Sequence, residues 1–299
     1  MKPTLLILAA GMASRYGSMK QIDGFGPNGE TIIDYSIYDA IKAGFGKVVF
    51  IIKEEFVENF KAIFEPKLNG RIETEYVFQN FDLKQFGIQE EIYREKPWGT
   101  AHAILSGRKV VKEPFCVINA DDFYGYDSFR KMVEFLTEEA TDSNYSIVGY
   151  KIGKTLSDFG SVSRGVCKTN EGDFLEEITE RTQVYRKEGT IVYEENGVEY
   201  PLDFETPVSM NFWGFTPAVF KLTEEMFKEF ALANQDKPKA EFFIPLIGET
   251  LVHNDTATFK VIPTDSQWFG VTYKEDKPFV QASIDQLIKN GEYPDTLWN

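Results

Sequence analysis

The sequence predicts an α/β protein whose mostly parallel sheet lies between helices. Three apolar runs, at residues 5–9, 48–52 and 115–119, lack the alternation of apolar and polar residues that marks a half-exposed strand. Segments with apolar residues at helical spacing, such as residues 31–43 and 127–139, separate these runs. Buried strands that alternate with amphipathic helices are typical of a parallel sheet covered on both faces.

The other elements of the first half continue this alternation. We expect helices at residues 55–64 and 101–111, and strands at residues 72–78 and 145–150. Gly44 directly follows the helix expected at residues 31–43, and glycine at this place commonly ends a helix.

The middle of the chain changes character. From about residue 160 to 206, short strand-like segments are separated by turn sequences. The turns at residues 187–189 and 195–197 end in glycine, as hairpin turns often do, and we expect an antiparallel β-rich insertion here. The chain then continues with helices at 217–233, 241–252 and 277–290 and a strand at 257–263, and we expect one composite domain over residues 1–299.

The composition excludes several classes of function. Of the 299 residues 42% are hydrophobic, and the formal net charge is −15. Because nucleic-acid binding needs Lys and Arg to neutralise phosphates, this acidic balance argues against a nucleic-acid partner. The apolar run at residues 5–10 is too short to span a membrane. We expect a cytoplasmic protein with no membrane partner, and the sequence is compatible with a homo-oligomer.

The histidines and cysteines restrict the metal chemistry. His102 and His253 are the only histidines, so a multi-histidine site is excluded. Cys116 and Cys167 lie in separate apolar strands, where isolated thiols are usually packed side chains. Any metal must therefore be held by oxygen ligands.

A loop rich in small residues follows the first strand and ends near Gln21. Small residues let the backbone approach a bulky anion with its N–H groups exposed. Arg15 can bind two phosphate oxygens at once, and Lys20 adds a point charge. A plain turn with two surface cations explains this local pattern equally well. On the phosphate interpretation, the nucleotide-binding residues are Leu8, Ala9, Ala10, Gly11, Met12, Ala13 and Ser14.

Two further segments have the composition of a ligand site. At residues 96–103, Gly99 leaves the backbone open to close approach by a ligand, and Thr100 can cap the following helix and offer a hydroxyl. Asp121 and Asp122 come directly after a buried strand, at the sheet edge where such folds bind ligands. Carboxylate oxygens suit Mg²⁺, although Asp122 is equally well explained as a cap of a turn or helix.

These segments together resemble the sugar-1-phosphate nucleotidylyltransferase family. Residues 8–11 match its Leu-Ala-Ala-Gly, residues 99–101 match its Gly-Thr-Ala, and Asp121 matches the Asp of its Gly-Asp-Asn motif. The chain departs from the family at Ala13, where a second glycine is usual, and at Met19, where proline is usual.

The resemblance spans nearly the whole chain and implies a three-layer α/β/α, GT-A-like (Rossmann-like) fold. It implies a nucleotide-binding half at residues 1–155 and an acceptor-binding half at residues 156–299. The implied reaction joins a nucleoside monophosphate from a triphosphate to a sugar-1-phosphate and releases pyrophosphate. Arg15, Lys20 and Asp121 are the implied catalytic residues, with Mg²⁺ held by Asp121.

The residue that reads the base is left open by the sequence. Family members usually carry a glutamine five residues before the glycine that corresponds to Gly99, and Arg94 stands there. Gln79 and Gln89 are the nearest candidates, and we assign Gln79 to the nucleotide site.

Weaker matches follow in the order that the family has them. Gly160, Glu180 with Arg181, and Asn211 match segments that contact the acceptor, so these residues are the implied acceptor-binding set. Each match taken alone also fits a salt-bridged hairpin or a packed aromatic strand.

The second metal ligand of the family is missing. The segment that begins at Trp268 matches the family's Trp-x-Asp segment, but Gly270 stands in place of the Asp. Either Asp265 substitutes as a ligand, or one carboxylate and waters suffice.

Three functions are consistent with these features. A sugar-phosphate nucleotidylyltransferase of nucleotide-sugar biosynthesis is favoured, with UTP preferred over dTTP, CTP or GTP. A cytidylyltransferase acting on phosphocholine or another non-sugar phosphate is the first alternative. A non-catalytic nucleotide-sugar sensor that has lost its second metal ligand at Gly270 is the other.

Overall fold

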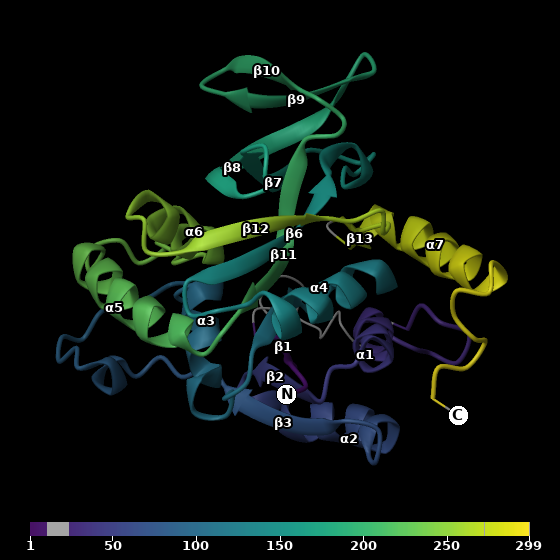
Figure 1. The fold of residues 1–299 in the computed structure, drawn as a ribbon, viewed down its shortest axis with the longest axis horizontal. Helices are drawn as coiled ribbons and strands as arrows, with labels where there is room; N and C mark the ends of the chain where they lie inside the picture. Colours follow the sequence, from purple (N-terminus) through teal and green to yellow (C-terminus); the bar gives the residue numbers. More distant parts are fainter. Residues whose placement is uncertain (11–23, 272, 299) are drawn as a thin grey trace.

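The computed structural model describes residues 1–10, 24–271 and 273–298 (Figure 1). Their centre is an eleven-stranded mixed sheet with the main order β10-β9-β8-β7-β11-β4-β1-β2-β3, in which β6 pairs with both β11 and β12. Its strands are β1 (Thr4–Leu8), β2 (Lys47–Ile52), β3 (Glu73–Phe78), β4 (Phe115–Asn119), β6 (Asn144–Lys151), β7 (Val162–Thr169), β8 (Leu175–Lys187), β9 (Thr190–Glu195), β10 (Val198–Leu202), β11 (Pro207–Phe215) and β12 (Thr258–Pro263).

Two kinds of strand pairing meet in this sheet. Strands β1, β2, β3 and β4 run parallel, and β12 runs parallel to β6. Strand β11 runs antiparallel to β4, β6 and β7, and the antiparallel strands β7 to β10 continue the sheet from it. Strands β8 to β10 form the arm at the top of Figure 1. The expected β-rich insertion is therefore confirmed.

Helices cover both faces of the sheet. They are α1 (Ile32–Ala43), α2 (Val57–Leu68), α3 (Thr100–Leu105), α4 (Tyr126–Glu138), α5 (Ala218–Ala233), α6 (Ile244–His253) and α7 (Lys277–Lys289). Alternate residues of β1 point to opposite sides, so Leu6 packs in one core with α3, α5 and α6, while Leu5 and Ile7 pack in the other with α1, α2 and α4. The predicted α/β architecture is confirmed.

Local signals mark the ends of several elements, and the helix end at Gly44 is where the sequence predicts it. Thr31 and Asp34 form a capping box at the start of α1, and Gly44 ends this helix in the left-handed conformation. Asn196 and Gly197 both have positive φ in the turn between β9 and β10, as a two-residue hairpin turn requires.

Two features differ from the sequence prediction. The helix expected at residues 101–111 is α3 followed by a short 3₁₀ turn at Ser106–Lys109. A separate two-stranded sheet pairs β5 (Asp122–Phe123) with β13 (Phe269–Gly270), and short strands of this kind carry no periodicity that a sequence pattern could reveal. This small sheet lies beside α7 in a third apolar cluster.

Candidate functional site

The carboxyl ends of the parallel strands bring the predicted nucleotide residues to one edge of the sheet. The Ala9 N–H donates to Ile51 at the end of β2 (2.8 Å), and the Ala120 N–H donates to the carbonyl of Leu8 (3.3 Å). Ala9 and Ala10 are buried. The predicted phosphate loop therefore leaves β1 directly beside the residues that follow β4. Its members Gly11, Met12, Ala13, Ser14, Arg15 and Lys20 lie outside the described residues.

Two consecutive carboxylates follow β4. Asp121 is exposed, whereas Asp122 begins β5 and is half-buried. The Asn119 side-chain amide donates to Asp122 Oδ2 (2.9 Å), and the Tyr124 hydroxyl lies 3.2 Å from the same oxygen. Loss of solvation and the neighbouring charge of Asp121 raise the pKa of Asp122 to about 7. The sequence interpretation of Asp122 as a simple cap missed this environment.

Gly270 faces the Asp122 carboxylate and the backbone of Asp121. It is paired with Asp122 across β13 and β5. A Cβ atom at Gly270 would lie 2.5 Å from Asp122 Oδ1 and 3.2 Å from the carbonyl oxygen of Asp121. Contacts that short are not tolerated, so the conformation of Asp122 requires glycine at position 270.

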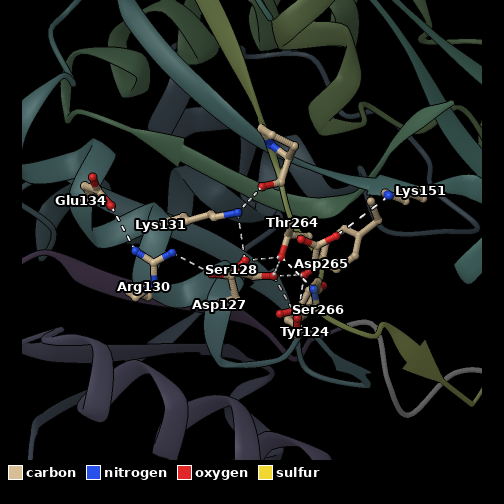
Figure 2. Close-up of polar contacts among 12 residues, drawn as sticks. Tyr124, Asp127, Ser128, Arg130, Lys131, Glu134, Lys151, Thr264, Asp265 and Ser266 are labelled. Atoms are coloured by element: carbon tan, nitrogen blue, oxygen red, sulfur yellow. Dashed lines mark hydrogen bonds and ion pairs between the residues drawn. The ribbon is translucent and has the colours of Figure 1, made fainter. Parts of the chain in front are cut away.

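The second predicted metal ligand, Asp265, has a different environment. Its side chain is 87% exposed, and its carboxylate lies 4.0 Å from Lys151 Nζ. Figure 2 draws this ion pair as a dashed line. The preceding residue, Thr264, is held to helix α4 through Asp127 Oδ2 and Ser128 Oγ, each at 3.1 Å. Within residues 1–10, 24–271 and 273–298 there is no group of three or more His, Cys, Asp or Glu side chains arranged to hold a metal. A metal role for Asp265 stays a prediction.

Gln79 lies at the same edge, directly after β3. It is buried, and its Nε2 lies 3.1 Å from Nδ1 of His102 on α3. Burial, together with the charges of Arg108 and Arg94, lowers the pKa of His102 to about 3, so this imidazole is neutral at physiological pH. When Nδ1 accepts the hydrogen bond, the oxygen of the Gln79 amide is left for a ligand. This contact of His102 was not predicted from the sequence.

The Arg94 side chain is engaged in contacts within the protein. Its guanidinium stacks over the Trp98 ring at 3.8 Å and donates to the carbonyl oxygens of Lys237 (2.8 Å) and Ala240. These contacts hold the segment before α3 in place. They explain why an arginine occupies position 94, where the family usually has a glutamine.

The structure gives Gly99 and Thr100 packing roles that the sequence did not predict. Gly99 has φ +102°, and a Cβ atom there would lie 2.5 Å from the carbonyl oxygen of Phe242. The absence of its side chain thus admits the Phe242 backbone. The prediction that Thr100 caps its own helix was wrong, because Gly99 is the N-cap of α3. The Thr100 hydroxyl instead accepts from the N–H of Ile244 at the start of α6 (3.1 Å).

The predicted acceptor residues Glu180 and Arg181 both lie on β8, but their side chains contact different neighbouring strands. A Cβ atom at Gly165 on β7 would lie 3.6 Å from Glu180 Oε2. Partial desolvation raises the pKa of Glu180, and the charge of Arg164 opposes this shift. Arg181 instead pairs with Glu195 on β9 (2.9 Å) and lies over the Tyr193 ring at 4.4 Å. The structure therefore does not bring this pair of residues together.

Arg164 is a buried cation that the sequence interpretation missed. Its Nε donates to the Thr155 hydroxyl (3.0 Å), its Nη1 donates to the Ser163 carbonyl (2.7 Å), and its guanidinium lies 4.7 Å from the Trp268 ring centre. It contributes positive charge near both Asp122 and Glu180. The sequence could have indicated this residue, because an arginine within an apolar strand is unusual and is rarely buried without partners.

Asn211 and Gly160 occupy specialised backbone positions. Asn211 has φ +61° within an irregularity in the pairing of β11 with β6, and bulges of this kind redirect side chains near functional sites. The Tyr124 hydroxyl lies 2.9 Å from the carbonyl oxygen of the preceding Met210, which connects this bulge to Asp122. Gly160 lies against Tyr273, whose hydroxyl would be 2.7 Å from a Cβ atom there.

This sheet edge is that of an α/β protein with a mostly parallel sheet, a class that binds ligands outside the carboxyl ends of its strands. The sequence model of the nucleotidyl transferase family matches residues 6–271, and the chain belongs to this family. A comparison with curated protein sequences found no match.

Solved structures share the fold across nearly their full length. The inositol-1-phosphate CTP transferase from T. maritima matches with TM-score 0.62 and 13% identity, covering 95% of this chain and 97% of that one. A Bacillus anthracis protein assigned as a glucose-1-phosphate thymidylyltransferase, in complex with sucrose, matches with TM-score 0.63 and 14% identity, covering 94% of each chain. A UDP-glucose pyrophosphorylase complexed with UDP-glucose matches with TM-score 0.58 and 15% identity, covering 96% and 99%. The expected GT-A-like fold is confirmed.

No helix in the described part of the chain has the length and apolar character needed to cross a bilayer.

Proposed function

We propose that the protein transfers a nucleoside monophosphate from a triphosphate to a sugar-1-phosphate and releases pyrophosphate. The observation that carries this proposal is the position of Asp121. It lies after β4, next to the strand from which the small-residue loop departs, in a chain of the nucleotidyl transferase family. The similar structures whose names describe transfer to inositol-1-phosphate or glucose-1-phosphate support the substrate class.

The reaction needs positioning and charge stabilisation more than acid–base chemistry. A phosphate oxygen of the acceptor attacks the α-phosphorus in line, the new P–O bond forms, and the bond to the β-phosphate oxygen breaks. In this proposal Arg15 and Lys20 bind the triphosphate, and Leu8 to Ser14 surround it. Asp121 would hold Mg²⁺, which would neutralise the phosphate oxygens when bound.

We assign separate sets of residues to the base and to the acceptor. Gln79 would bind the base, with its amide oriented by His102. Gly99 and Thr100, whose side-chain positions pack against Phe242 and Ile244, would contact the base through their backbone. Glu180 and Asn211 would bind the sugar, and Gly160 would lie near it. Because Arg181 already pairs with Glu195, we propose that it contributes to the acceptor site through charge at a distance.

UTP is the favoured triphosphate. The UDP-glucose pyrophosphorylase supports this choice, while the CTP transferase and thymidylyltransferase show that the same fold takes other nucleotides. The acidic chain fits a cytoplasmic enzyme of nucleotide-sugar biosynthesis, as expected from its sequence.

The test is pyrophosphate release from a matrix of UTP, dTTP, CTP and GTP with several sugar-1-phosphates, inositol-1-phosphate and phosphocholine, in the presence of Mg²⁺. We expect release with UTP and a sugar-1-phosphate. Release with CTP and phosphocholine alone would establish the cytidylyltransferase alternative. Nucleotide binding without turnover of any pair would establish the sensor.

A further inference from the structure

The Tyr124 side chain connects the end of β4 to the middle of β11. It is fully buried, and its hydroxyl accepts from the Asn119 N–H at the end of β4 (3.0 Å). The same hydroxyl lies 2.9 Å from the Met210 carbonyl oxygen on β11 and 3.2 Å from Asp122 Oδ2 on β5. One phenolic oxygen thus contacts three strands that are separate in the sequence.

The hydroxyl has a single proton to donate. It lies nearer to the Met210 carbonyl oxygen than to Asp122 Oδ2. Asp122 Oδ2 in addition accepts from the side-chain amide of Asn119 (2.9 Å). Both observations favour the Met210 carbonyl as the acceptor of the Tyr124 proton.

The part of β11 that Tyr124 contacts is the bulge in its pairing with β6. Ser209 and Trp213 are the paired residues on either side, so residues 210–212 make up the bulge. Asn211 at its centre has φ +61°, a left-handed conformation that asparagine adopts more readily than most residue types. A residue keeps such a conformation where the surrounding structure fixes it.

Tyr124 contacts the bulge on both sides of Asn211. The residue before it, Met210, receives the Tyr124 hydroxyl through its carbonyl oxygen, and the residue after it, Phe212, packs edge-on against the Tyr124 ring with ring centres 5.2 Å apart. Both neighbours are buried in the same apolar core as Tyr124, whereas Asn211 is half-buried. These contacts fix the backbone from which the Asn211 amide projects.

We propose that Tyr124 is a positioning residue of the acceptor site, where it fixes the β11 bulge and thereby the place of Asn211 relative to Asp121. The proposal rests on the proposed function, which assigns the acceptor to Asn211 and the phosphate centre to Asp121. In-line attack depends on the distance between the two reacting groups, and a misplacement of about 1 Å can lower the rate by about 10²-fold.

The kinetic test is Tyr124→Phe, which removes the hydroxyl and keeps the ring. With the substrate pair that releases pyrophosphate fastest, we expect kcat/KM for the sugar-1-phosphate to fall by at least about ten-fold, while the KM for the triphosphate changes by less than about three-fold. Equal rises in both KM values would place the effect at Asp122 instead and would overturn the proposal.

Tyr145→Phe is the matched control. Tyr145 is also fully buried, and its hydroxyl donates to a backbone carbonyl, that of Asp142 (2.8 Å), at the start of β6. This variant loses the same kind of hydrogen bond away from the bulge, so both kinetic constants should stay at their wild-type values. A loss in Tyr145→Phe as large as that in Tyr124→Phe would show a general effect of removing a buried hydroxyl and contradict the proposal.

A double-mutant cycle tests whether Tyr124 acts through Asn211. Asn211→Gly removes the side-chain amide and tolerates the left-handed backbone. In this background Tyr124→Phe should lower kcat/KM for the sugar-1-phosphate by no more than about three-fold, because the contact that it misplaces is already gone. Effects of the two substitutions that simply multiply would show that Tyr124 does not act through Asn211.

Hydrogen–deuterium exchange measures the bulge without any substrate. In Tyr124→Phe the backbone amides of residues 210–212 should exchange at least about ten-fold faster than in wild type, and in Tyr145→Phe they should not change. Unchanged exchange in both variants contradicts the proposal. Thermal melting shows whether each variant folds. If Tyr124→Phe does not fold, Phe212→Leu, which weakens the packing of the bulge against the Tyr124 ring, takes its place with the same expected results.

The two proposals fail in distinguishable ways. If the assigned reaction is wrong, the wild-type protein releases no pyrophosphate with any pair, yet the exchange of residues 210–212 still reports whether Tyr124 holds the bulge. If only the role of Tyr124 is wrong, the wild-type protein is active and Tyr124→Phe matches it in both kinetic constants and in exchange.

Discussion

The parallel strands β1 to β4 and the antiparallel strands β7 to β11 position their side chains by different rules. Every parallel strand ends at the same edge, so residues that follow each strand meet there: Ala9 after β1, Gln79 after β3 and Asp121 after β4. In the antiparallel part the strands run in both directions, and neighbouring residues of one strand point to opposite faces. Glu180 lies near Gly165 of β7, while Arg181 pairs with Glu195 of β9.

This difference determines where a sequence motif predicts the position of its side chains in the structure. In the parallel part, the end of a strand is enough to place a residue at the site. Within strand β8, consecutive side chains point to opposite faces of the sheet, so the motif Glu180-Arg181 is divided between the two faces. The predictions below test this contrast.

The largest effect is expected at Asp121. Asp121→Ala should lower kcat by about 10³-fold, because it removes a carboxylate that would hold the charge-neutralising metal. Steady-state pyrophosphate release measures this change, and an unchanged melting temperature shows that the fold is intact. A near-normal kcat would remove the main support for the assigned reaction.

His102 provides a stability test of the parallel part. Its folded-state pKa of about 3 lies below the unfolded value of 6.5, so the unfolded chain binds a proton first as the pH falls. The stabilisation is complete above pH 6.5 and declines toward pH 3, with a loss of about 3 kcal/mol by pH 4.

The measurement is the free energy of unfolding by denaturant between pH 7 and pH 4. Relative to wild type, His102→Gln should lose less stability over this interval. Parallel pH profiles of the two proteins would show that the imidazole is not protected from protonation.

Substitutions at Glu180 and Arg181 test the antiparallel part of the sheet. Glu180→Gln should raise the KM for the sugar phosphate by about ten-fold and leave the KM for the triphosphate unchanged, since a hydrogen bond from a sugar hydroxyl to a carboxylate is stronger than one to an amide. Equal rises in both KM values would place Glu180 outside the acceptor site.

The smallest effect is expected for Arg181→Gln. Its exposed ion pair with Glu195 contributes about 0.2–1 kcal/mol to stability, and its loss should change either KM by no more than about three-fold. The same kinetic assay applies. An effect as large as that of Glu180→Gln would show that the two residues act together, against the arrangement of β8.

The sequence by itself determined the elements and the position of one carboxylate. Strand and helix periodicity, the helix end at Gly44 and the Asn196-Gly197 turn depend on neighbours within a few residues, so they could be predicted locally. Asp121 could be placed at the ligand-binding edge because it follows a buried parallel strand.

The tertiary structure alone decided which side chains face one another. Asp122 meets Gly270, Gln79 meets His102, and Gly99 admits the backbone of Phe242. Each of these contacts joins separate elements through strand register or helix packing, which no local pattern encodes. The local residue types therefore predicted a cap at Asp122, whereas the strand pairing places its carboxylate against Gly270.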